Sequence, residues 1–244
     1  MPTFVDSNVV VTTGPAAETM LMLKRDTPTL SCSRERWEEA QRYERRTWLE
    51  LHREMSDDRN EFHAAAMGGY EALRGCGARS LLEVGCGPFT NARLILPVLG
   101  GVESVRLADP LIVEYMSHPH CPYAQGGVLS GSRLSAKTLS ECVDGYQYDV
   151  IVSINVAEHC DEFSLEWILD LCFPGGHVVV GERCYSDWRV AEHCRTHYDA
   201  GHPLRLCDSH WAKFAESVDI KHEARRDGED GGFSSLRYLI GRKK

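Results

Sequence analysis

Apolar residues in the first third of the chain follow a helical rhythm. Across residues 34–55 they fall at spacings that are sums of threes and fours, which is typical of one face of a helix. Ser33 stands directly before this stretch, where an N-terminal cap is expected. A second helix is expected over 58–74, because glycines that stop helices follow it. Residues 1–32 show no strong periodicity, and we expect this N-terminal segment to be irregular.

The stripe of the first expected helix mixes apolar with polar side chains. It contains Trp37, Gln41, Glu44, Trp48, Leu51 and Met55. A polar group on a buried face costs about 1–3 kcal/mol if it finds no hydrogen-bond partner. Two hypotheses follow. Either the helix packs on a sheet and neighbouring backbone satisfies the two polar residues, or it is a lid that points Gln41, Glu44 or Trp48 into a pocket.

Short apolar strands alternate with helical stretches beyond residue 77. The strands are expected at 80–84, 103–108, 148–154 and 177–181, with a helix after the first whose apolar positions are Ala92, Leu94, Ile95 and Leu99. Such alternation is typical of βαβ units and a parallel sheet. The last two strand-like segments, 218–222 and 237–241, are joined by a glycine-rich turn without a helix. They predict a β-hairpin and therefore one antiparallel strand.

A glycine-containing turn follows the first of these strands, and an acid follows the second. Gly85 and Gly87 stand where strand passes into helix, and such a turn lets a ligand approach backbone N–H groups closely. Asp109 lies 22 residues beyond Gly87, where a carboxylate can accept both hydroxyls of a ribose. The glycines alone would also suit a simple tight turn, but together with the acid they favour a nucleoside cofactor. Thr90 stands where the dinucleotide fingerprint has its third glycine, which counts against NAD.

Three segments together resemble the class I S-adenosylmethionine-dependent methyltransferases. They are LLEVGCGPFTNARL from residue 81, YDVIVSINVAEH from residue 148 and FPGGHVVV from residue 173. The resemblance spans residues 78–243 and implies a Rossmann-like α/β sandwich of three layers. Its sheet would have seven strands, mostly parallel, with an antiparallel C-terminal hairpin strand. It also implies S-adenosyl-L-methionine as cofactor. We therefore expect a methyltransferase domain over 77–244, preceded by N-terminal helices over 33–76 that would form the lid of the second hypothesis.

The resemblance further implies a set of cofactor-binding residues. They are Trp48, Glu83, Gly85, Cys86, Gly87, Asp109, Pro110, Asn155 and Val156. Among them Asp109 would hold the ribose, and Glu83 would lie beside the methionine part. Residues 135–139 offer no carboxylate for the adenine amine, so the adenine contacts stay unassigned.

Histidines are the natural general bases near neutral pH, and several stand close to the expected site. His159 follows the strand at 148–154, where it either removes a proton from the acceptor or makes a structural hydrogen bond. His197 and His202 are the other two candidates for the base. His193 and His197 have the i, i+4 spacing of metal ligands, but no third ligand accompanies them, so we expect no metal site.

Two further resemblances point to residues that contact the acceptor. The segment 199–205 resembles part of methyltransferases from glycan-biosynthesis clusters, which implies that His202 and Arg205 line the acceptor site. The stretch 40–48 resembles the lead helix of the same enzymes, and we expect its Glu44 to contact the acceptor.

Charge narrows the class of substrate. The 244-residue chain has a formal net charge of −9 and no dense basic run beyond its C-terminal tail, which disfavours nucleic acid. It also reads SINV over 153–156, where amino-methylating nucleic-acid enzymes have a segment with two prolines. We therefore expect methylation of a small-molecule or sugar acceptor, on oxygen. A nucleic-acid or protein methyltransferase and an inactive binding protein of this fold are the alternatives.

Cysteine usage and the N-terminus indicate the compartment. The ten cysteines are dispersed singly without a CxxC pair, so the sequence predicts neither a zinc ribbon nor a thioredoxin motif. No N-terminal signal pattern and no apolar run of membrane-spanning length is present. These features favour a cytoplasmic protein with reduced thiols and no membrane span. A homodimer stays open, because the apolar helix stripe can face another subunit.

Overall fold

A seven-stranded sheet organises the chain, of which the computed structural model describes residues 3–4, 9–13, 19–23, 30–143, 145–186, 198–228 and 234–244. Its strands are β5 (Ser80–Val84), β6 (Ser104–Ala108), β7 (Arg133–Ser135), β8 (Tyr148–Ile154), β10 (Cys172–Tyr185), β12 (Val218–Asp227) and β13 (Ser234–Lys243). They lie in the order β12-β13-β10-β8-β5-β6-β7, and the short β11 (Leu206–Cys207) pairs with the end of β10. Neighbours from β10 to β7 are parallel, whereas β13 is antiparallel to both β10 and β12. The predicted mostly parallel sheet with a terminal hairpin is confirmed.

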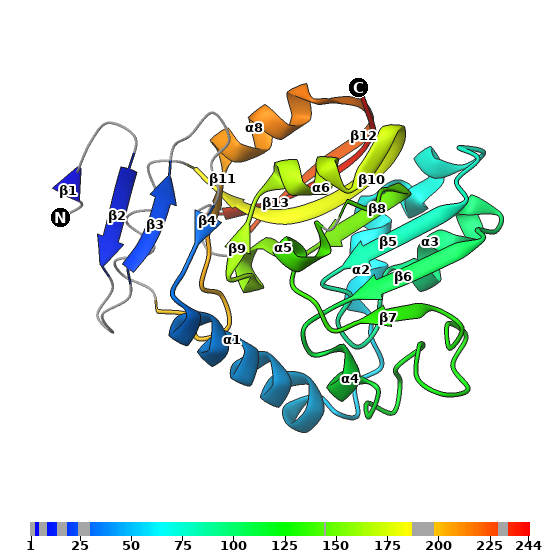
Figure 1. Cartoon of the computed structure of the whole chain (residues 1–244), viewed down its shortest axis with the longest axis horizontal. Helices are drawn as coiled ribbons and strands as arrows, with labels where there is room; N and C mark the ends of the chain where they lie inside the picture. The colour runs from blue at the N-terminus through cyan, green and yellow to red at the C-terminus, as the bar shows by residue number, and fades with distance from the viewer. Residues whose placement is uncertain are drawn as a thin grey trace.

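Helices cover both faces of this sheet and complete three layers (Figure 1). One face carries α2 (Arg59–Ala66), the 3-10 helix η2 (Gly68–Leu73), α3 (Ala92–Leu99) and α4 (Ile112–Tyr115), and the other carries α5 (Leu139–Cys142), α6 (Leu165–Asp170) and α8 (Asp208–Glu216). Side chains alternate across a strand. Leu81 therefore packs in the first core and Leu82 in the second, and both are fully buried. This burial on two sides explains why the strands read as continuous apolar runs.

The expected strands match the observed ones most closely at the centre of the sheet. The strand at 148–154 coincides with β8, and the one at 80–84 with β5. The strand expected at 177–181 is part of the longer β10, whose pairing with β8 shifts register between Cys172 and His177. The Pro-Gly-Gly segment at 174–176 lies within this irregularity.

The first helix is α1 (Arg34–Arg46), and it continues as the π-helix η1 (Thr47–Leu51). Ser33 caps it, accepting a hydrogen bond from Arg36 N at 3.2 Å, as the sequence predicted. Leu51 is 61% exposed, so the prediction that it lies on the buried stripe is wrong. The π-helix changes the number of residues per turn at this point. Side chains that continue the helical spacing of the sequence, such as Leu51, therefore no longer point toward the protein interior. Figure 1 shows α1 lying apart from the sheet, between β4 (Leu30–Ser31) and α4.

A second, small antiparallel sheet lies at the N-terminus. Its order is β1 (Thr3–Phe4), β2 (Val9–Thr13), β3 (Thr19–Leu23), β4 and β9 (Glu162–Phe163). These strands differ from our expectation of an irregular segment over 1–32. Leu30 of β4 pairs with Phe163 of β9, and both side chains are fully buried. Within the described part of the chain, none of the helices combines the length and the apolar character needed to cross a lipid bilayer.

Candidate functional site

The glycine turn and the acid after β6 converge, as the sequence predicted. Gly85 and Gly87 follow the last residue of β5, and both have positive φ, at 60° and 55°. The carboxylate of Asp109 faces this turn: its Oδ2 accepts a hydrogen bond from Gly87 N at 3.0 Å. Its Oδ1 accepts from Leu111 N at 2.8 Å. Burial raises the pKa of Asp109 to about 6, although the two backbone hydrogen bonds oppose this rise.

The two glycines differ in what surrounds them. A Cβ built on Gly85 would lie 2.6 Å from Cγ2 of Val156, whereas one built on Gly87 would meet nothing within 4 Å. Val156 follows the end of β8, so the turn after β5 packs directly against the turn after β8. The open space beside Gly87 leaves room for a ligand against the turn.

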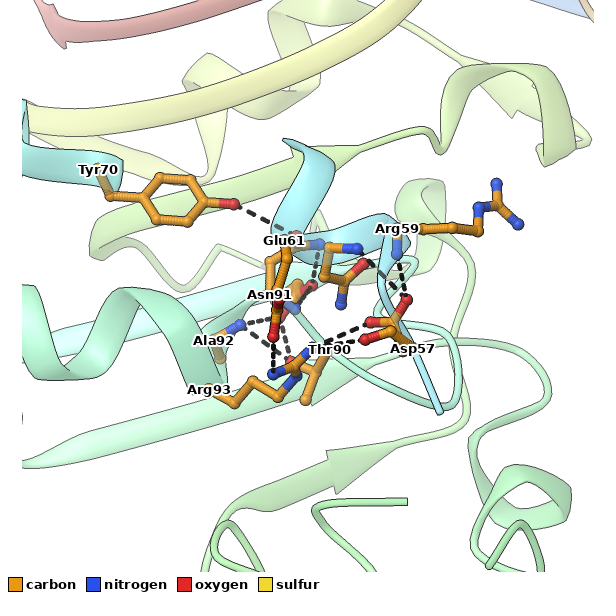
Figure 2. Close-up of polar contacts among 10 residues, drawn as sticks. Asp57, Arg59, Glu61, Tyr70, Thr90, Asn91, Ala92 and Arg93 are labelled. Carbon is orange, nitrogen blue, oxygen red and sulfur yellow. Dashed lines mark hydrogen bonds and ion pairs between the residues drawn. The ribbon is translucent and has the colours of Figure 1, made fainter. Parts of the chain in front are cut away.

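Glu83 does not take the position predicted for it. Its carboxylate is buried and accepts hydrogen bonds from the hydroxyl of Thr90, from Asn91 N at 2.8 Å and from Ala92 N at 2.9 Å. Figure 2 shows these three residues at the start of α3, whose first N–H groups have no partners within the helix. Glu83 therefore holds the helix N-terminus, and it is not among the residues that line the cavity described below.

The carboxylate of Asp57 links the start of α2 to α3. Asp57 Oδ1 accepts hydrogen bonds from Arg59 N at 2.9 Å and from Asn60 N at 3.3 Å, and its Oδ2 accepts from Arg93 Nη2 at 3.2 Å. Figure 2 shows Asp57 between Arg59 and Arg93, with the Arg59 guanidinium pointing away from it. That guanidinium lies 5.2 Å from the centre of the Trp48 ring. The start of α2 is thereby fixed against α3.

These elements enclose a cavity of about 270 Å³. Eleven predicted site residues line it: Glu44, Trp48, Gly85, Cys86, Gly87, Asp109, Pro110, Asn155, Val156, His159 and His202. It lies at the carboxyl ends of β5, β6 and β8, where ligands bind in open α/β sheets. The cavity is therefore the candidate functional site.

Helix α1 turns its mixed stripe toward this cavity. Gln41 Nε2 donates a hydrogen bond to the carbonyl of His159 at 3.2 Å, and Trp48 Nε1 donates to Glu44 Oε2 at 3.0 Å. The Trp48 ring also meets the Phe89 ring edge-on, with centroids 5.5 Å apart. Gln41 and Glu44 thus have hydrogen-bond partners at the cavity wall. Both hypotheses for this helix, packing on the sheet and a lid over a pocket, require such partners.

Two histidines meet beside Glu44. The rings of His159 and His202 have centroids 4.6 Å apart. His159 Nδ1 lies 3.1 Å from the carbonyl oxygen of Gly201 and 3.5 Å from Glu44 Oε1. Burial lowers the pKa of His159, although the Glu44 carboxylate opposes this shift. His159 is therefore held mainly in its neutral form.

His202 has an acidic partner that sequence reasoning did not identify. Its Nδ1 lies 2.6 Å from Asp199 Oδ2. Burial alone would lower the pKa of His202, but the hydrogen bond to Asp199 and nearby carboxylates outweigh it and raise that pKa. The same contact holds the pKa of Asp199 below its ordinary value against the effect of burial. The motif around 199–205 contained this acid, but only the folded turn shows which side chain it faces.

Two further predicted site residues are not brought to the cavity among the described residues. Arg205 is buried, is not among the cavity-lining residues, and donates hydrogen bonds from Nη1 to the carbonyls of His202 and Leu204. Its side chain supports the turn from behind, so a direct contact with the acceptor is not supported. His197, together with His193, lies outside the described residues.

Several lining residues were not predicted. They are Trp37, Tyr43, Thr47, Arg59, Asn60, His63, Tyr115, Lys137, Thr138 and Leu139, together with others on the same walls. Lys137 and Thr138 belong to the stretch in which the sequence offered no adenine-binding acid. Thr47 Oγ1 is buried beside the cavity and finds no hydrogen-bond partner among the described residues. In the structure, Thr47 is marked by the π-helix that contains it, since such distortions concentrate at functional sites. The sequence pattern does not reveal that distortion.

Comparison with known proteins finds the fold but no close relative. No family profile matches the chain, and no curated protein matches it in sequence. The solved structure of N-methyltransferase NodS from Bradyrhizobium japonicum, in complex with S-adenosyl-L-homocysteine, superposes with a TM-score of 0.58 at 14% identity, covering 85% of this chain and 98% of that one. A SAM-dependent methyltransferase from Leishmania major gives a TM-score of 0.51 at 16% identity, covering 84% and 82%. The chain therefore has the fold of the class I S-adenosylmethionine-dependent methyltransferases, as its three sequence motifs predicted.

Proposed function

We propose that the chain binds S-adenosyl-L-methionine in this cavity and transfers the methyl group to a small-molecule or sugar acceptor, on oxygen. The convergence of the glycine turn and the Asp109 carboxylate on one wall carries the proposal. When bound, the cofactor supplies an electrophilic methyl group on a sulfonium. The protein's own task is then to position the acceptor and to remove its proton.

The residues present fit such a cofactor. The carboxylate of Asp109 is available to accept ribose hydroxyls, and the open space beside Gly87 admits a ligand against the backbone. The unpartnered Thr47 hydroxyl is a further polar group for a bound molecule to satisfy. Arg59 would pair with the carboxylate of the methionine part. The remaining contacts would come from Trp48, Cys86, Pro110, Asn155 and Val156, as the sequence motifs imply.

Helix α1 would act as the lid over this site. Gln41 and Glu44 of α1 and Trp48 of the following η1 line the cavity. Gln41 also contacts the backbone of His159. The negative charge of Glu44 would complement the cationic sulfonium, and its Oε1 would contact the acceptor. A lid of this kind excludes water from the reacting atoms.

His202 is the best placed general base. Because Nδ1–H donates to Asp199, the other ring nitrogen, Nε2, is left with a lone pair that can take a hydroxyl proton. An acid that orients the base in this way is a recurrent catalytic arrangement. His159 would stay neutral and hydrogen-bond the acceptor. The cavity volume of about 270 Å³ lies just below the range of about 300–1,000 Å³ for ligand pockets, which favours a small acceptor.

A second acceptor atom is supported by one comparison. NodS is an N-methyltransferase, so an amine acceptor is the alternative within the same proposal. Methylation of nucleic acid or protein has no such support, and the formal net charge of −9 opposes a polyanionic substrate.

Calorimetry with S-adenosylmethionine and S-adenosylhomocysteine tests cofactor binding first. We expect one site per chain, and D109N to weaken binding at least about tenfold, because hydrogen bonds to a charged group contribute about 1.5–3 kcal/mol each. If neither compound gives a heat of binding, the proposed activity is refuted, and a catalytically inactive binding protein of this fold is the alternative that is left.

A screen of alcohols, sugars and amines, scored by homocysteine release, then tests transfer. We expect H202N to lower turnover about 10²–10⁴-fold while cofactor affinity is unchanged. H120N, at an exposed histidine outside the cavity, is the matched control. Equal turnover for H202N and wild type would exclude His202 as the base.

A further inference from the structure

Glu44, His159 and His202 form a cluster with the chemistry of a metal site. One potential ligand atom from each residue lies within 4.8 Å of the other two. Ligand atoms around a four-coordinate zinc ion, at about 2.0–2.2 Å from it, lie about 3–4 Å apart. Small side-chain rotations therefore suffice to close the three groups around one ion. The cluster lines the cavity, so an ion can reach it and keep an open coordination position.

The groups behind the cluster are those that support metal ligands. Metal-binding histidines usually donate their second ring N–H to a carboxylate or a carbonyl. His202 has Asp199 at 2.6 Å from its Nδ1, which directs Nε2 away from that partner. Glu44 receives a hydrogen bond from Trp48 Nε1 on Oε2, which leaves Oε1 on the side of His159. Two of the three ligands are thus already oriented by neighbours.

The ligand set selects the kind of ion. Two imidazoles and one carboxylate suit zinc, cobalt, nickel or iron, whereas magnesium and calcium prefer oxygen ligands alone. Among the described residues, no cysteine belongs to the cluster. We propose that Glu44, His159 and His202 bind one divalent transition-metal ion. The bound ion occupies Nε2 of His202, the atom that would remove the proton from the methyl acceptor. Zinc therefore inhibits methyl transfer. The inhibition rests on the proposed function, whereas the binding site does not.

Binding is tested on the full chain after treatment with a chelator. We expect cobalt(II) to bind with one-to-one stoichiometry and to give an absorption spectrum of nitrogen and oxygen ligands. H159N, H202N and E44Q should each weaken binding at least about tenfold, and D199N about 10–100-fold through the orientation of His202. H120N alters an exposed histidine beside His118 and should bind cobalt as the wild type does. Circular dichroism shows whether each variant is folded.

A thiolate spectrum, or unchanged affinity in folded H159N and H202N, would overturn the metal site. Either result would leave the proposed function untouched, because cofactor binding is measured separately with S-adenosylhomocysteine.

Inhibition is tested with an acceptor found in the screen. Zinc should compete with the acceptor, should leave the affinity for S-adenosylhomocysteine unchanged, and should lose potency at least about tenfold in H159N, which retains His202 as base. Stimulation of turnover by zinc would overturn the inhibition. If S-adenosylhomocysteine does not bind at all, the proposed function is refuted. The cobalt titration would still test the metal site independently.

Discussion

Replacing Gly85 with alanine tests whether the glycine turn exists for close approach to the neighbouring turn. At this position φ is +60°, and the added Cβ would lie 2.6 Å and 2.8 Å from the two terminal carbons of Val156. Separations under 3.0 Å are not seen for real Cβ atoms. Either the turn or Val156 must therefore move, and both line the cavity.

The expected loss has two parts. A left-handed conformation costs an L-residue about 1–2 kcal/mol relative to glycine. Overpacking adds about 1–3 kcal/mol, so G85A should lower the free energy of unfolding by about 2–5 kcal/mol. Gly87 is the matched control, because its φ is +55° but its Cβ would meet nothing within 4 Å. G87A should therefore lose only the first part, about 1–2 kcal/mol.

Urea unfolding followed by circular dichroism measures both variants, and a double-mutant cycle with V156A isolates the contact. Shortening Val156 removes the atoms that the new Cβ would meet, so G85A/V156A should be more stable than the sum of the single effects by about 1–3 kcal/mol. Equal losses in G85A and G87A would refute the reasoning, as would additive effects in the cycle. In that case the conformation of the turn alone, and not its contact with Val156, would require glycine.

Three other measurements probe the frame of the site. E83Q replaces one acceptor oxygen by an amide donor against the N–H groups that start α3, and should lower the free energy of unfolding by about 1–3 kcal/mol; no loss in urea unfolding would show that the helix finds other acceptors. Because ribose hydroxyls favour ionised Asp109, whose pKa burial raises to about 6, cofactor affinity should fall as the pH drops through that value, and binding near it should release up to about one proton. Calorimetry in buffers of different ionisation heat counts that proton, and D109N should release none. S33A should lower stability by about 0.5–2 kcal/mol through loss of the cap on α1, whereas S33T should retain most of it.

The sequence predicted the centre of the sheet because the signal there is local. β5 and β8 are mostly apolar runs bounded by turn residues, because burial on both faces favours apolar side chains. Their buried polar residues, Glu83 and Ser153, have hydrogen-bond partners. β7 has only three residues and lies at the sheet edge, so it carries no pattern to detect. β9 and β11 have two residues each and are defined only by the strands they pair with. Such elements follow from tertiary contacts, which periodicity does not contain.

The same division applies to the site. The glycine turn and Asp109 directly follow strands, so their position relative to the sheet is fixed by the chain itself. Asp199 and Arg59 reach the cavity region from turns and helix starts whose placement depends on distant contacts. The family resemblance implies that Glu83 lies beside the cofactor, but a carboxylate next to the turn can face either way. The free N–H groups of α3 decide the direction, and they are apparent only once the helix is in place.

Backbone strain occurs in the networks that hold the start of α3 and the turn after β8. Among the described residues, the non-glycine residues with positive φ are Tyr70, Thr90 and Asn155. Such conformations cost about 1–3 kcal/mol each and persist only where surrounding contacts enforce them. The Tyr70 hydroxyl donates to Asn91 Oδ1 at 3.3 Å, and the Thr90 hydroxyl donates to Glu83. Both residues therefore belong to the network that holds the start of α3.

Asn155 is enforced by a different set of contacts, on the opposite side of the glycine turn. Its N–H donates to the Gly181 carbonyl at 2.6 Å, and the buried carboxylate of Glu182 accepts hydrogen bonds from Val156 N at 3.0 Å and Ala157 N at 3.0 Å. Val156 is the residue against which Gly85 packs. Two buried carboxylates, on β5 and on β10, thus fix the two turns that pack against each other in one wall of the cavity. A wall held in this way presents its backbone groups without rearrangement, which is what precise positioning of a methyl donor requires.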